Sequence, residues 1–494
     1  MRADERIRDE ATMRRTTTAL ILALSLAPIS GCRGLGADHT PIGNEEGSPA
    51  GQILFVGTLP SGRTDLYLID QTGQTLTSLT GQMGVLDEGR TITTTSETSL
   101  GPVPSEDGQR VLFTLQRPGG ASRSLYELEV FGGGITALGE APAGLRRAFY
   151  DRTGERILLD VRDPDSGEGH LSLWTDGGPE DLSPDGEELL FDAFFPDDDR
   201  LLVRVGSGEA RRLAVLDLGD GSLAPFATSG GLELLAPRLS PDGGAVVFQG
   251  RGDPNACYDL FEVTIDGADG AGLKAPTPLG AAAAAWDSLY GDLTPPGDHS
   301  PDDDGDAEAQ DEDAPPVVAG FDTTECLSVS APSWAPDGSQ RIAFLATSDT
   351  ERADAFILDL STGATTAVSA DVDADGPGVT ASPRWSPTGA WLLFSVSWSG
   401  GSGDGSHVDL FVSDGQSVPV SLTDGYNGVP SLAHWDATGE RLLFWSRSSA
   451  GETSSGSSDA VVVDVAGGQI TAVTAGQGLH AAYPLWLDRN SLYY

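Results

Sequence analysis

Residues 334–345 read Trp-Ala-Pro-Asp-Gly-Ser-Gln-Arg-Ile-Ala-Phe-Leu, which combines an aromatic residue, a tight turn and an apolar strand. In such a turn proline restricts φ, aspartate bonds the neighbouring backbone and glycine accepts a positive φ. A second strand-like segment follows at residues 355–360, and a glycine-containing turn then leads into a threonine-rich strand. The stretch therefore indicates a unit of short strands and not a helical domain.

The same pattern recurs along the chain. Its eight copies open at Pro104, Tyr150, Phe195, Leu239, Trp334, Trp385, Trp435 and Trp486. The last turn residues of successive copies, which are glycine in all but the copies at Phe195 and Trp486, lie about 44 to 51 residues apart, except for an interval of 95 between Gly243 and Gly338. Four short strands per period of this length are typical of a β-propeller blade. Because one blade cannot bury both of its faces alone, we expect an all-β ring of four-stranded blades that cover one another.

Two copies, residues 334–344 and 385–394, are similar to the TolB-like propeller repeat, whose usual form is aromatic-Ser-Pro-Asp-Gly before an Ile-Ala-Phe strand. The resemblance extends over nearly all of residues 51–494, although the copies at Phe195 and Trp486 are eroded. It implies a propeller fold and says little about function. TolB-like proteins are expected to have six blades.

The two ends of the repeat region indicate how the ring closes. The region opens at residues 53–56 without a preceding turn pattern, and it finishes with such a pattern at residues 486–494. We therefore expect the last segment to supply the inner strand of the blade begun by the first. This predicts eight blades, with seven as the alternative if one eroded copy is misread. Residues 492–494 duplicate the role of residues 53–56, and the sequence leaves open which of the two occupies that place.

Residues 1–32 have the pattern of a lipoprotein signal peptide. Arg14 and Arg15 precede an apolar run at residues 19–26, which is too short to span a bilayer. Ile-Ser-Gly before Cys32 matches the lipobox of bacterial lipoproteins, in which the cysteine becomes an acylated N-terminus. The alternative is an ordinary signal peptide with an incidental cysteine.

The residues after Cys32 indicate where the protein is held. Residues 33–50 are polar and aperiodic, as in a flexible tether. Arginine and not aspartate follows the cysteine, which by the enterobacterial sorting rule implies the outer membrane. We therefore expect a monomeric lipoprotein of the cell envelope that faces the periplasm or the exterior.

The charge of the chain limits its partners. Its 74 acidic residues and 29 basic residues give a net charge of −45, which would repel phosphate backbones and makes nucleic acid an unsuitable partner. An insertion at about residues 281–328 contains thirteen acids and no lysine or arginine. It is predicted to be a solvated loop, with a cation-binding or partner-binding flap as the alternative.

Two small sites are suggested by local patterns. Cys257 and Cys326 flank the insertion, and an oxidising compartment would favour a disulfide between them. Asp371, Asp373 and Asp375 alternate before a glycine, which suits calcium, although an EF-hand requires a glutamate where Ser382 stands. No other cofactor is predicted.

No catalytic motif accompanies these patterns. The chain contains no GxSxG, HExxH or P-loop sequence, and its six histidines include no HxH pair. His434 and His480 are the two that could face the central channel. We therefore predict a binding or scaffold protein, not an enzyme, whose partner is an envelope protein, a peptide or a glycan. The alternative is a secreted propeller hydrolase or lyase that acts on a cell-surface polysaccharide.

Overall fold

The computed structural model describes residues 50–81, 91–92, 101–116, 122–183, 187–206, 211–226, 233–252, 257–265, 276–282, 284–285, 327–347, 352–369, 372, 378–379, 381–398, 407–426, 428–448 and 458–488. All of them belong to one compact unit, Pro41–Tyr494. Cys32, Cys326, Asp371, Asp373 and Asp375 lie outside the described residues.

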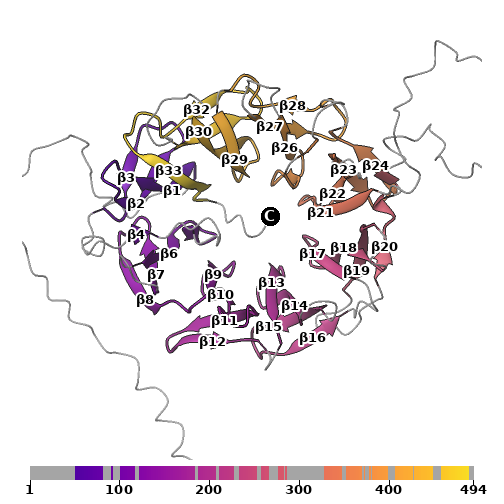
Figure 1. The fold of residues 1–494 in the computed structure, drawn as a ribbon, viewed down its shortest axis with the longest axis horizontal. Coiled ribbons are helices and arrows are strands. Elements are labelled where there is room, and N and C mark those ends of the chain that lie inside the picture. Colours follow the sequence, from indigo (N-terminus) through magenta and orange to yellow (C-terminus); the bar gives the residue numbers. More distant parts are fainter. Residues whose placement is uncertain are drawn as a thin grey trace, which may run out of the picture. The chain divides into compact units, whose positions relative to one another are not determined.

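The described residues form eight antiparallel sheets arranged as the blades of a propeller (Figure 1). From the innermost strand outward, blade 1 contains β33 (His480–Trp486), β1 (Gln52–Thr58), β2 (Thr64–Asp70) and β3 (Leu76–Ser78). Blade 2 contains β4 (Thr91–Ile92) and β5 (Val103–Pro104), which both pair with β6 (Arg110–Gln116), then β7 (Arg123–Glu129) and β8 (Ile135–Glu140). Blade 3 contains β9 (Leu145–Tyr150), β10 (Ile157–Arg162), β11 (Gly169–Thr175) and β12 (Gly178–Asp181). Blade 4 contains β13 (Leu189–Phe194), β14 (Arg200–Val205), β15 (Arg212–Asp217) and β16 (Leu223–Phe226).

The second half of the ring repeats this order. Blade 5 contains β17 (Glu233–Leu239), β18 (Ala245–Arg251), β19 (Asp259–Thr264) and β20 (Thr277–Pro278). Blade 6 contains β21 (Ser328–Trp334), β22 (Arg341–Thr347), β23 (Ala353–Asp359) and β24 (Ala364–Ala367). Blade 7 contains β25 (Arg384–Trp385), β26 (Leu392–Trp398), β27 (His407–Ser413) and β28 (Val420–Ser421). Blade 8 contains β29 (Gly428–Trp435), β30 (Arg441–Ser448), β31 (Ser458–Asp464) and β32 (Ile470–Ala472). The predicted count of eight blades is confirmed.

Blade 1 is built from both ends of the repeat region. β33 pairs with β1 in antiparallel register, with Ile53 opposite Trp486 and Thr58 opposite His480. Residues 53–56 therefore occupy the second strand of this blade, while β33 supplies the innermost strand. Residues 492–494 lie outside the described residues.

The turn after each innermost strand opens with one backbone hydrogen bond, and this bond aligns the eight blades. Its donors are the N–H groups of Ser105, Asp151, Phe195, Ser240, Ala335, Ser386, Asp436 and Leu487. In blade 1 the bond joins the chain ends, because the Leu487 N–H donates to the Gln52 carbonyl over 2.9 Å. We call the residue before each donor the anchor residue. The anchor of blade 4 is therefore Phe194 and not Phe195, which sequence alignment had placed there.

Paired aromatic rings fill the middle of several blades. Phe344 on β22 lies opposite Phe356 on β23, and their stacked rings have centroids 5.4 Å apart. Phe394 and Phe411 repeat this arrangement in blade 7 at 5.7 Å. Since these strands are covered by blades on both faces, their side chains are almost wholly buried, and the core is divided among the blade interfaces.

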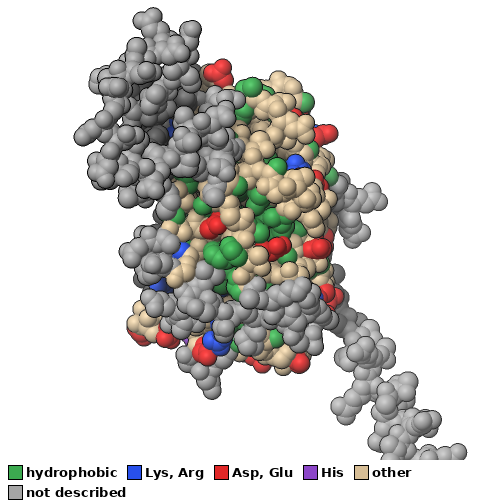
Figure 2. Space-filling view, turned by 90° about the vertical axis from the view of Figure 1, so that its right-hand side faces the viewer, with side chains coloured by type: hydrophobic (Ala, Val, Ile, Leu, Met, Phe, Trp, Pro, Cys, Tyr) green, Lys and Arg blue, Asp and Glu red, His purple; other side chains and the backbone are tan. Residues whose placement is uncertain are grey.

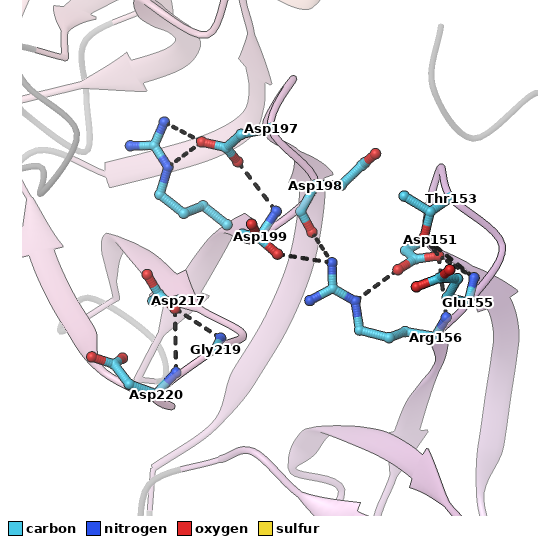
Figure 3. Close-up of polar contacts among 11 residues, drawn as sticks. Asp151, Thr153, Glu155, Arg156, Asp197, Asp198, Asp199, Asp217, Gly219 and Asp220 are labelled. Atoms are coloured by element: carbon cyan, nitrogen blue, oxygen red, sulfur yellow. Dashed lines mark hydrogen bonds and ion pairs between the residues drawn. The ribbon is translucent and has the colours of Figure 1, made fainter. Parts of the chain in front are cut away.

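The turn rim also links neighbouring blades. In Figure 3 the Arg156 side chain reaches from the turn of blade 3, where its Nε donates to Asp151, to the turn of blade 4. There its Nη2 donates to the Asp198 carbonyl over 2.6 Å and to an Asp199 carboxylate oxygen over 3.2 Å. Arg341 donates in the same way to the Gly389 carbonyl over 2.8 Å. These hydrogen bonds engage arginine side chains at the turn rim, where acidic residues outnumber basic ones.

Acidic side chains are also spread over the outer side of the ring, with few basic ones between them (Figure 2). The first residues of the acidic insertion behave differently. Residues 281–282 and 284–285 are helical, and Ala281 and Ala285 are buried against the core of blades 5 and 6. The solvated loop predicted for the rest of the insertion falls on residues 286–326, outside the described part of the chain.

Candidate anion-binding surface at the propeller axis

The residue before each anchor lies on an innermost strand, at one level around the propeller axis. We call these eight the axial residues. They are Val103, Phe149, Ala193, Arg238, Ser333, Arg384, His434 and Leu485. Blades 5 to 8 thus present two arginines, a serine and a histidine in succession, whereas the axial residues of the other blades are apolar.

The innermost strands reverse the charge balance of the whole chain. In their described residues they contain four arginines, Arg146, Arg147, Arg238 and Arg384, and two acids, Asp192 and Glu233. The complete chain has 29 basic residues against 74 acids. A local excess of arginine in so acidic a protein requires an explanation beyond composition.

Both acids of the innermost strands are already paired with arginines of second strands. The Nε atom of Arg204 on β14 donates to the two carboxylate oxygens of Asp192 over 3.1 and 2.9 Å. Arg251 on β18 donates to Glu233 over 2.7 Å. Arg147 is likewise engaged, because its Nη2 lies 2.8 Å from the buried Asp160 carboxylate. Each of these acids is therefore already bound to another arginine, although the charge of Asp192 also acts on Arg238.

Arg238 and Arg384, which we call the axial arginine pair, are both exposed. No ion pair to either of them is found within the described parts of the chain, and Arg238 donates only to the carbonyl of its neighbour Pro237, over 3.0 Å. The surrounding protein displaces part of the water around each of these exposed side chains, and this desolvation lowers the pKa of each guanidinium. Arginine remains protonated despite such shifts.

The two arginines are close enough to influence each other. The positive charge of Arg238 further lowers the pKa of Arg384, although blade 6 stands between their blades. The axial residue of that blade is Ser333, which has a small side chain and is partly exposed. Both side chains are thus exposed, and both lie on innermost strands, in blades 5 and 7.

The negative charge of the Asp192 carboxylate acts on the nearby arginines, including Arg238. Burial raises the pKa of its carboxyl, and the charges of Arg204, Arg238 and Arg147 act in the opposite direction. Arg238 thus lies between a carboxylate that is already bound to Arg204 and the like charge of Arg384. No such carboxylate affects Arg384 among the described residues.

The backbone of the axial pair is held by the next blade in each case. The indole Nε1 of Trp334 donates to the Arg238 carbonyl over 3.1 Å, and that of Trp435 donates to the Arg384 carbonyl over 3.4 Å. The anchors Trp385 and Trp486 bond the axial carbonyls of Ser333 and His434 in the same way. The guanidinium groups therefore extend from fixed backbone positions, as a preorganised binding site requires.

A β-bulge precedes Arg238 and sets its direction. Leu235 pairs with Gln249 and Arg238 with Val247, so Ala236 and Pro237 together face a single residue of β18. Ala236 has a φ of 46°, in the left-handed region that disfavours side chains. Equivalent bulges contain Ala331 at 52° and Tyr483 at 51°, each also before a proline.

The two histidines that the sequence suggested for the central channel both lie on innermost strands, at different positions along them. His434 is an axial residue, whereas His480 begins β33 and pairs with Thr58 at the opposite end of blade 1. His480 stands six positions before Trp486, the anchor residue of blade 1, which corresponds to roughly 20 Å along a strand. In the described ranges no group of three potential metal ligands is found, and neither histidine belongs to one.

The other predicted sites are only partly covered. Cys257 is disulfide-bonded, but Cys326 is not described, so their pairing stays a prediction. The calcium ligands Asp371, Asp373 and Asp375 and the lipidation site Cys32 also stay predictions. Among the described residues there is no helix with the length and hydrophobicity needed to cross a membrane.

No protein-family model and no curated protein matches the chain. Among solved structures it is similar to TolB from Acinetobacter baumannii, with 14% identity and a TM-score of 0.32 over 65% of this chain and 63% of that one. A prolyl endopeptidase shares 10% identity at a TM-score of 0.47, over 84% of this chain and 53% of the other. Oligogalacturonate lyase in complex with manganese shares 13% identity at a TM-score of 0.42, over 81% and 95% of the two chains.

The chain thus spans less than two thirds of the length of the first two of these proteins. Similarity at these identities and TM-scores transfers no activity, and the propeller assignment rests on the sheet topology itself. The chain is an eight-bladed, all-β propeller that resembles TolB proteins among others in structure.

Proposed function

We propose that this chain is a binding protein of the bacterial cell envelope, held at a membrane by lipid on Cys32. It uses the axial residues of blades 5 to 8 to bind a protein, peptide or glycan partner. The observation that supports this proposal most directly is the axial arginine pair, because two exposed guanidinium groups without an ion pair among the described residues are held on strands in a protein of net charge −45. Arginine forks bind carboxylate and phosphate groups in two-point geometry.

The anchor is tested by labelling bacteria that express the full chain with a radioactive fatty acid. Lipid on Cys32 predicts incorporation of label and recovery in the membrane fraction, whereas Cys32→Ala is expected to lose both. Two acyl chains give stable membrane attachment where a single chain is marginal. Equal labelling of wild type and Cys32→Ala would contradict this part of the proposal.

Partner binding is tested with a photoreactive benzoylphenylalanine placed at the axial residue His434 of the full chain in cells. The proposal expects a discrete crosslinked adduct that weakens strongly when Arg238→Ala and Arg384→Ala are combined. The control carries the same probe at Ser222, which is exposed on the outer hairpin of blade 4. Equal adducts at the two positions, or none at either, would refute axial binding. Release of products from cell-surface polysaccharide without an adduct would instead support the hydrolase or lyase alternative.

A further inference from the structure

One position on the turn rim carries an arginine in most blades. The carbonyl that accepts the turn-opening hydrogen bond belongs to a residue at the start of the second strand, which we call the closing residue. From blade 1 to blade 8 the closing residues are Gln52, Arg110, Arg156, Arg200, Ala245, Arg341, Trp391 and Arg441. Arginine thus occupies this position in five blades, whereas blade 5 has alanine.

Two closing arginines make the same pair of contacts with the next blade. The Arg341 guanidinium lies 4.7 Å from the ring centroid of Trp385, the anchor of blade 7, and its Nη2 donates to the Gly389 carbonyl over 2.8 Å. In blade 2 the Arg110 guanidinium lies 5.1 Å from the ring centroid of Tyr150, the anchor of blade 3, and donates to the carbonyl of the turn glycine. An anchor ring and a glycine carbonyl four residues further on therefore form a binding place for one guanidinium.

Blade 6 presents the same two groups, but blade 5 has no closing arginine to bind them. Trp334 is the anchor of blade 6, and Gly338 follows it by four residues with a φ of 73°, which matches the 69° of Gly389. The closing residue of blade 5 is Ala245, whose methyl group is too short for either contact. The Trp334 side chain is accordingly partly exposed, whereas the other three tryptophan anchors are buried.

The turn glycine of blade 6 is open as well. A methyl group added at Gly338 would meet no described atom within 4 Å, whereas one added at Gly389 would lie 2.6 Å from the Asp337 side chain. No hydrogen bond to the Gly338 carbonyl is found within the described ranges. Blade 7 also lacks a closing arginine, but there Trp391 replaces it and packs in the same apolar cluster as the anchor Trp435.

We infer that the Trp334 ring and the Gly338 carbonyl bind an arginine side chain of a partner protein, in the place that a closing arginine takes in other blades. The guanidinium stacks on the ring and donates to the carbonyl. A cation suits this position, because Asp337 precedes Gly338 and the chain has a net charge of −45. Both contacts are made to the guanidinium alone, so the described residues offer nothing that would select the other end of a free amino acid.

This site is separate from the axial arginine pair and binds a base where that pair binds an acid. The indole Nε1 of Trp334 donates to the Arg238 carbonyl over 3.1 Å, which fixes the ring before a ligand arrives. Because that bond is made to the backbone, loss of the Arg238 side chain leaves it in place. The inference therefore does not rest on the proposed function.

The test uses the full chain, purified in detergent and labelled with 5-fluorotryptophan, and records its fluorine NMR spectrum. The Trp334 signal is the one that disappears in Trp334→Phe. The ligand is N-acetylarginine methylamide, compared with the same derivatives of lysine, which lacks the planar fork, and of citrulline, which is uncharged. We expect a saturable shift of the Trp334 signal by the arginine derivative, about three- to tenfold weaker binding of the lysine derivative, and no saturable response to citrulline.

Ala245→Arg supplies the arginine from within the chain. Its guanidinium is expected to make the contacts that Arg341 makes in the next blade, and so to weaken binding of the arginine derivative roughly tenfold or more. The melting temperature of this variant should exceed that of wild type, since two contacts are added. Loss of binding together with a gain of stability cannot result from unfolding. Ala245→Gln, which adds a side chain without charge, is the matched control and is expected to keep the binding.

Several outcomes would overturn the inference. It is wrong if the Trp334 signal does not move with the arginine derivative, if citrulline moves it equally, or if Ala245→Arg still responds as wild type does. Tighter binding of free arginine than of its derivative would identify a small-molecule ligand and overturn the assignment to a partner protein. The Trp385 ring is already covered by Arg341, so an equal shift of its signal would show that the response is not specific to the open site.

The same spectra separate this inference from the proposed function. The combined Arg238→Ala and Arg384→Ala variant is expected to bind the arginine derivative as wild type does. If the His434 crosslink is absent while the Trp334 signal still responds, the proposed function alone fails. If the crosslink forms and the Trp334 signal does not respond, the inference alone fails.

Discussion

Ala331 shows how single residues shape the innermost strands. Its φ of 52° lies in the left-handed region, where a side chain costs about 1 to 2 kcal/mol. The Ala-Pro and Tyr-Pro pairs at the bulges are visible in the sequence, but the residue before proline usually favours extended backbone. The positive φ therefore arises from the bulge and could not be predicted from local preference.

Replacing Ala331 by glycine is expected to leave stability unchanged or to raise the free energy of unfolding by up to about 1 kcal/mol, because glycine adopts this φ without strain. The matched control in the same blade is Ala343→Gly, at a buried position in the middle of β22, where about 1 kcal/mol should be lost. Urea unfolding of both variants provides the comparison. Equal losses at the two positions would contradict the assignment of strain to residue 331.

Asp70 in the hairpin between β2 and β3 provides a test by pH. Although burial raises the pKa of its carboxyl, hydrogen bonds from Thr72 and Thr75 dominate and lower the pKa to about 2. A carboxyl with a depressed folded-state pKa adds stability above its unfolded pKa near 3.8, and loses this contribution as the pH falls toward 2.

We therefore expect Asp70→Asn to cost about 1 kcal/mol at pH 7 after allowance for solvent screening. The difference from wild type should shrink as the pH falls below about 4, because the wild-type carboxyl becomes protonated. Urea unfolding of both proteins between pH 7 and pH 2.5 measures this difference. A gap that stays constant over the range would show that charge is not responsible.

At the scale of elements, the anchor residue contributes to the contact between neighbouring blades. Trp435 is buried and donates to the Arg384 carbonyl, so it contributes both apolar area and a hydrogen bond. Trp435→Phe is expected to lower the free energy of unfolding by about 2 kcal/mol, because it removes the bond and leaves a space beside blade 7. Thermal and urea unfolding measure the change.

Trp445 on β30 supplies a matched control for this substitution. Its indole Nε1 is buried and has no hydrogen-bond partner within the described residues. Trp445→Phe removes a similar ring portion without breaking a bond, and it should cost clearly less than Trp435→Phe. A larger loss at Trp445 would mean that the inter-blade bond is unimportant.

The repeat pattern predicted the blades because anchor, turn and apolar strand recur together in the sequence. It also predicted blade 1, since the pattern is missing at the start of the region and present at its end. Phe195 was misplaced by one residue because two phenylalanines adjoin in a copy without the usual turn glycine. Only the turn-opening hydrogen bond shows which of them ends the strand.

The axial arginines were missed for a different reason. Arg238 and Arg384 are far apart in the sequence, and neither belongs to a known motif. Each stands one residue before an anchor, so an alignment of the copies would have revealed their common position. Their exposure and the effect of the Arg238 charge on Arg384 depend on the arrangement of the blades in space, which the sequence alone does not give. His434 and His480 both lie on innermost strands, as the sequence indicated, but the sequence did not reveal that they stand at different positions along those strands.

For the whole molecule, closure by β33 is the feature that depends on both chain ends. A chain that stops after residue 479 lacks β33 and leaves Ile53 and Phe55 of β1 without their neighbours. We expect this chain to lose its cooperative thermal transition and to aggregate, because an apolar edge strand is exposed. A chain that stops after residue 488 retains every described contact of blade 1 and serves as the control. Identical melting curves for the two truncated chains would contradict closure by β33.

The same pairing has a consequence for how the protein is made. β1 is among the first folded elements to leave the ribosome, and its partner β33 is the last. Until β33 has been synthesised, blade 1 therefore has an open inner edge, and the Leu487–Gln52 bond cannot form. Until the final strand is delivered, a chaperone that covers the edge of β1 would protect the nascent chain from pairing with another copy.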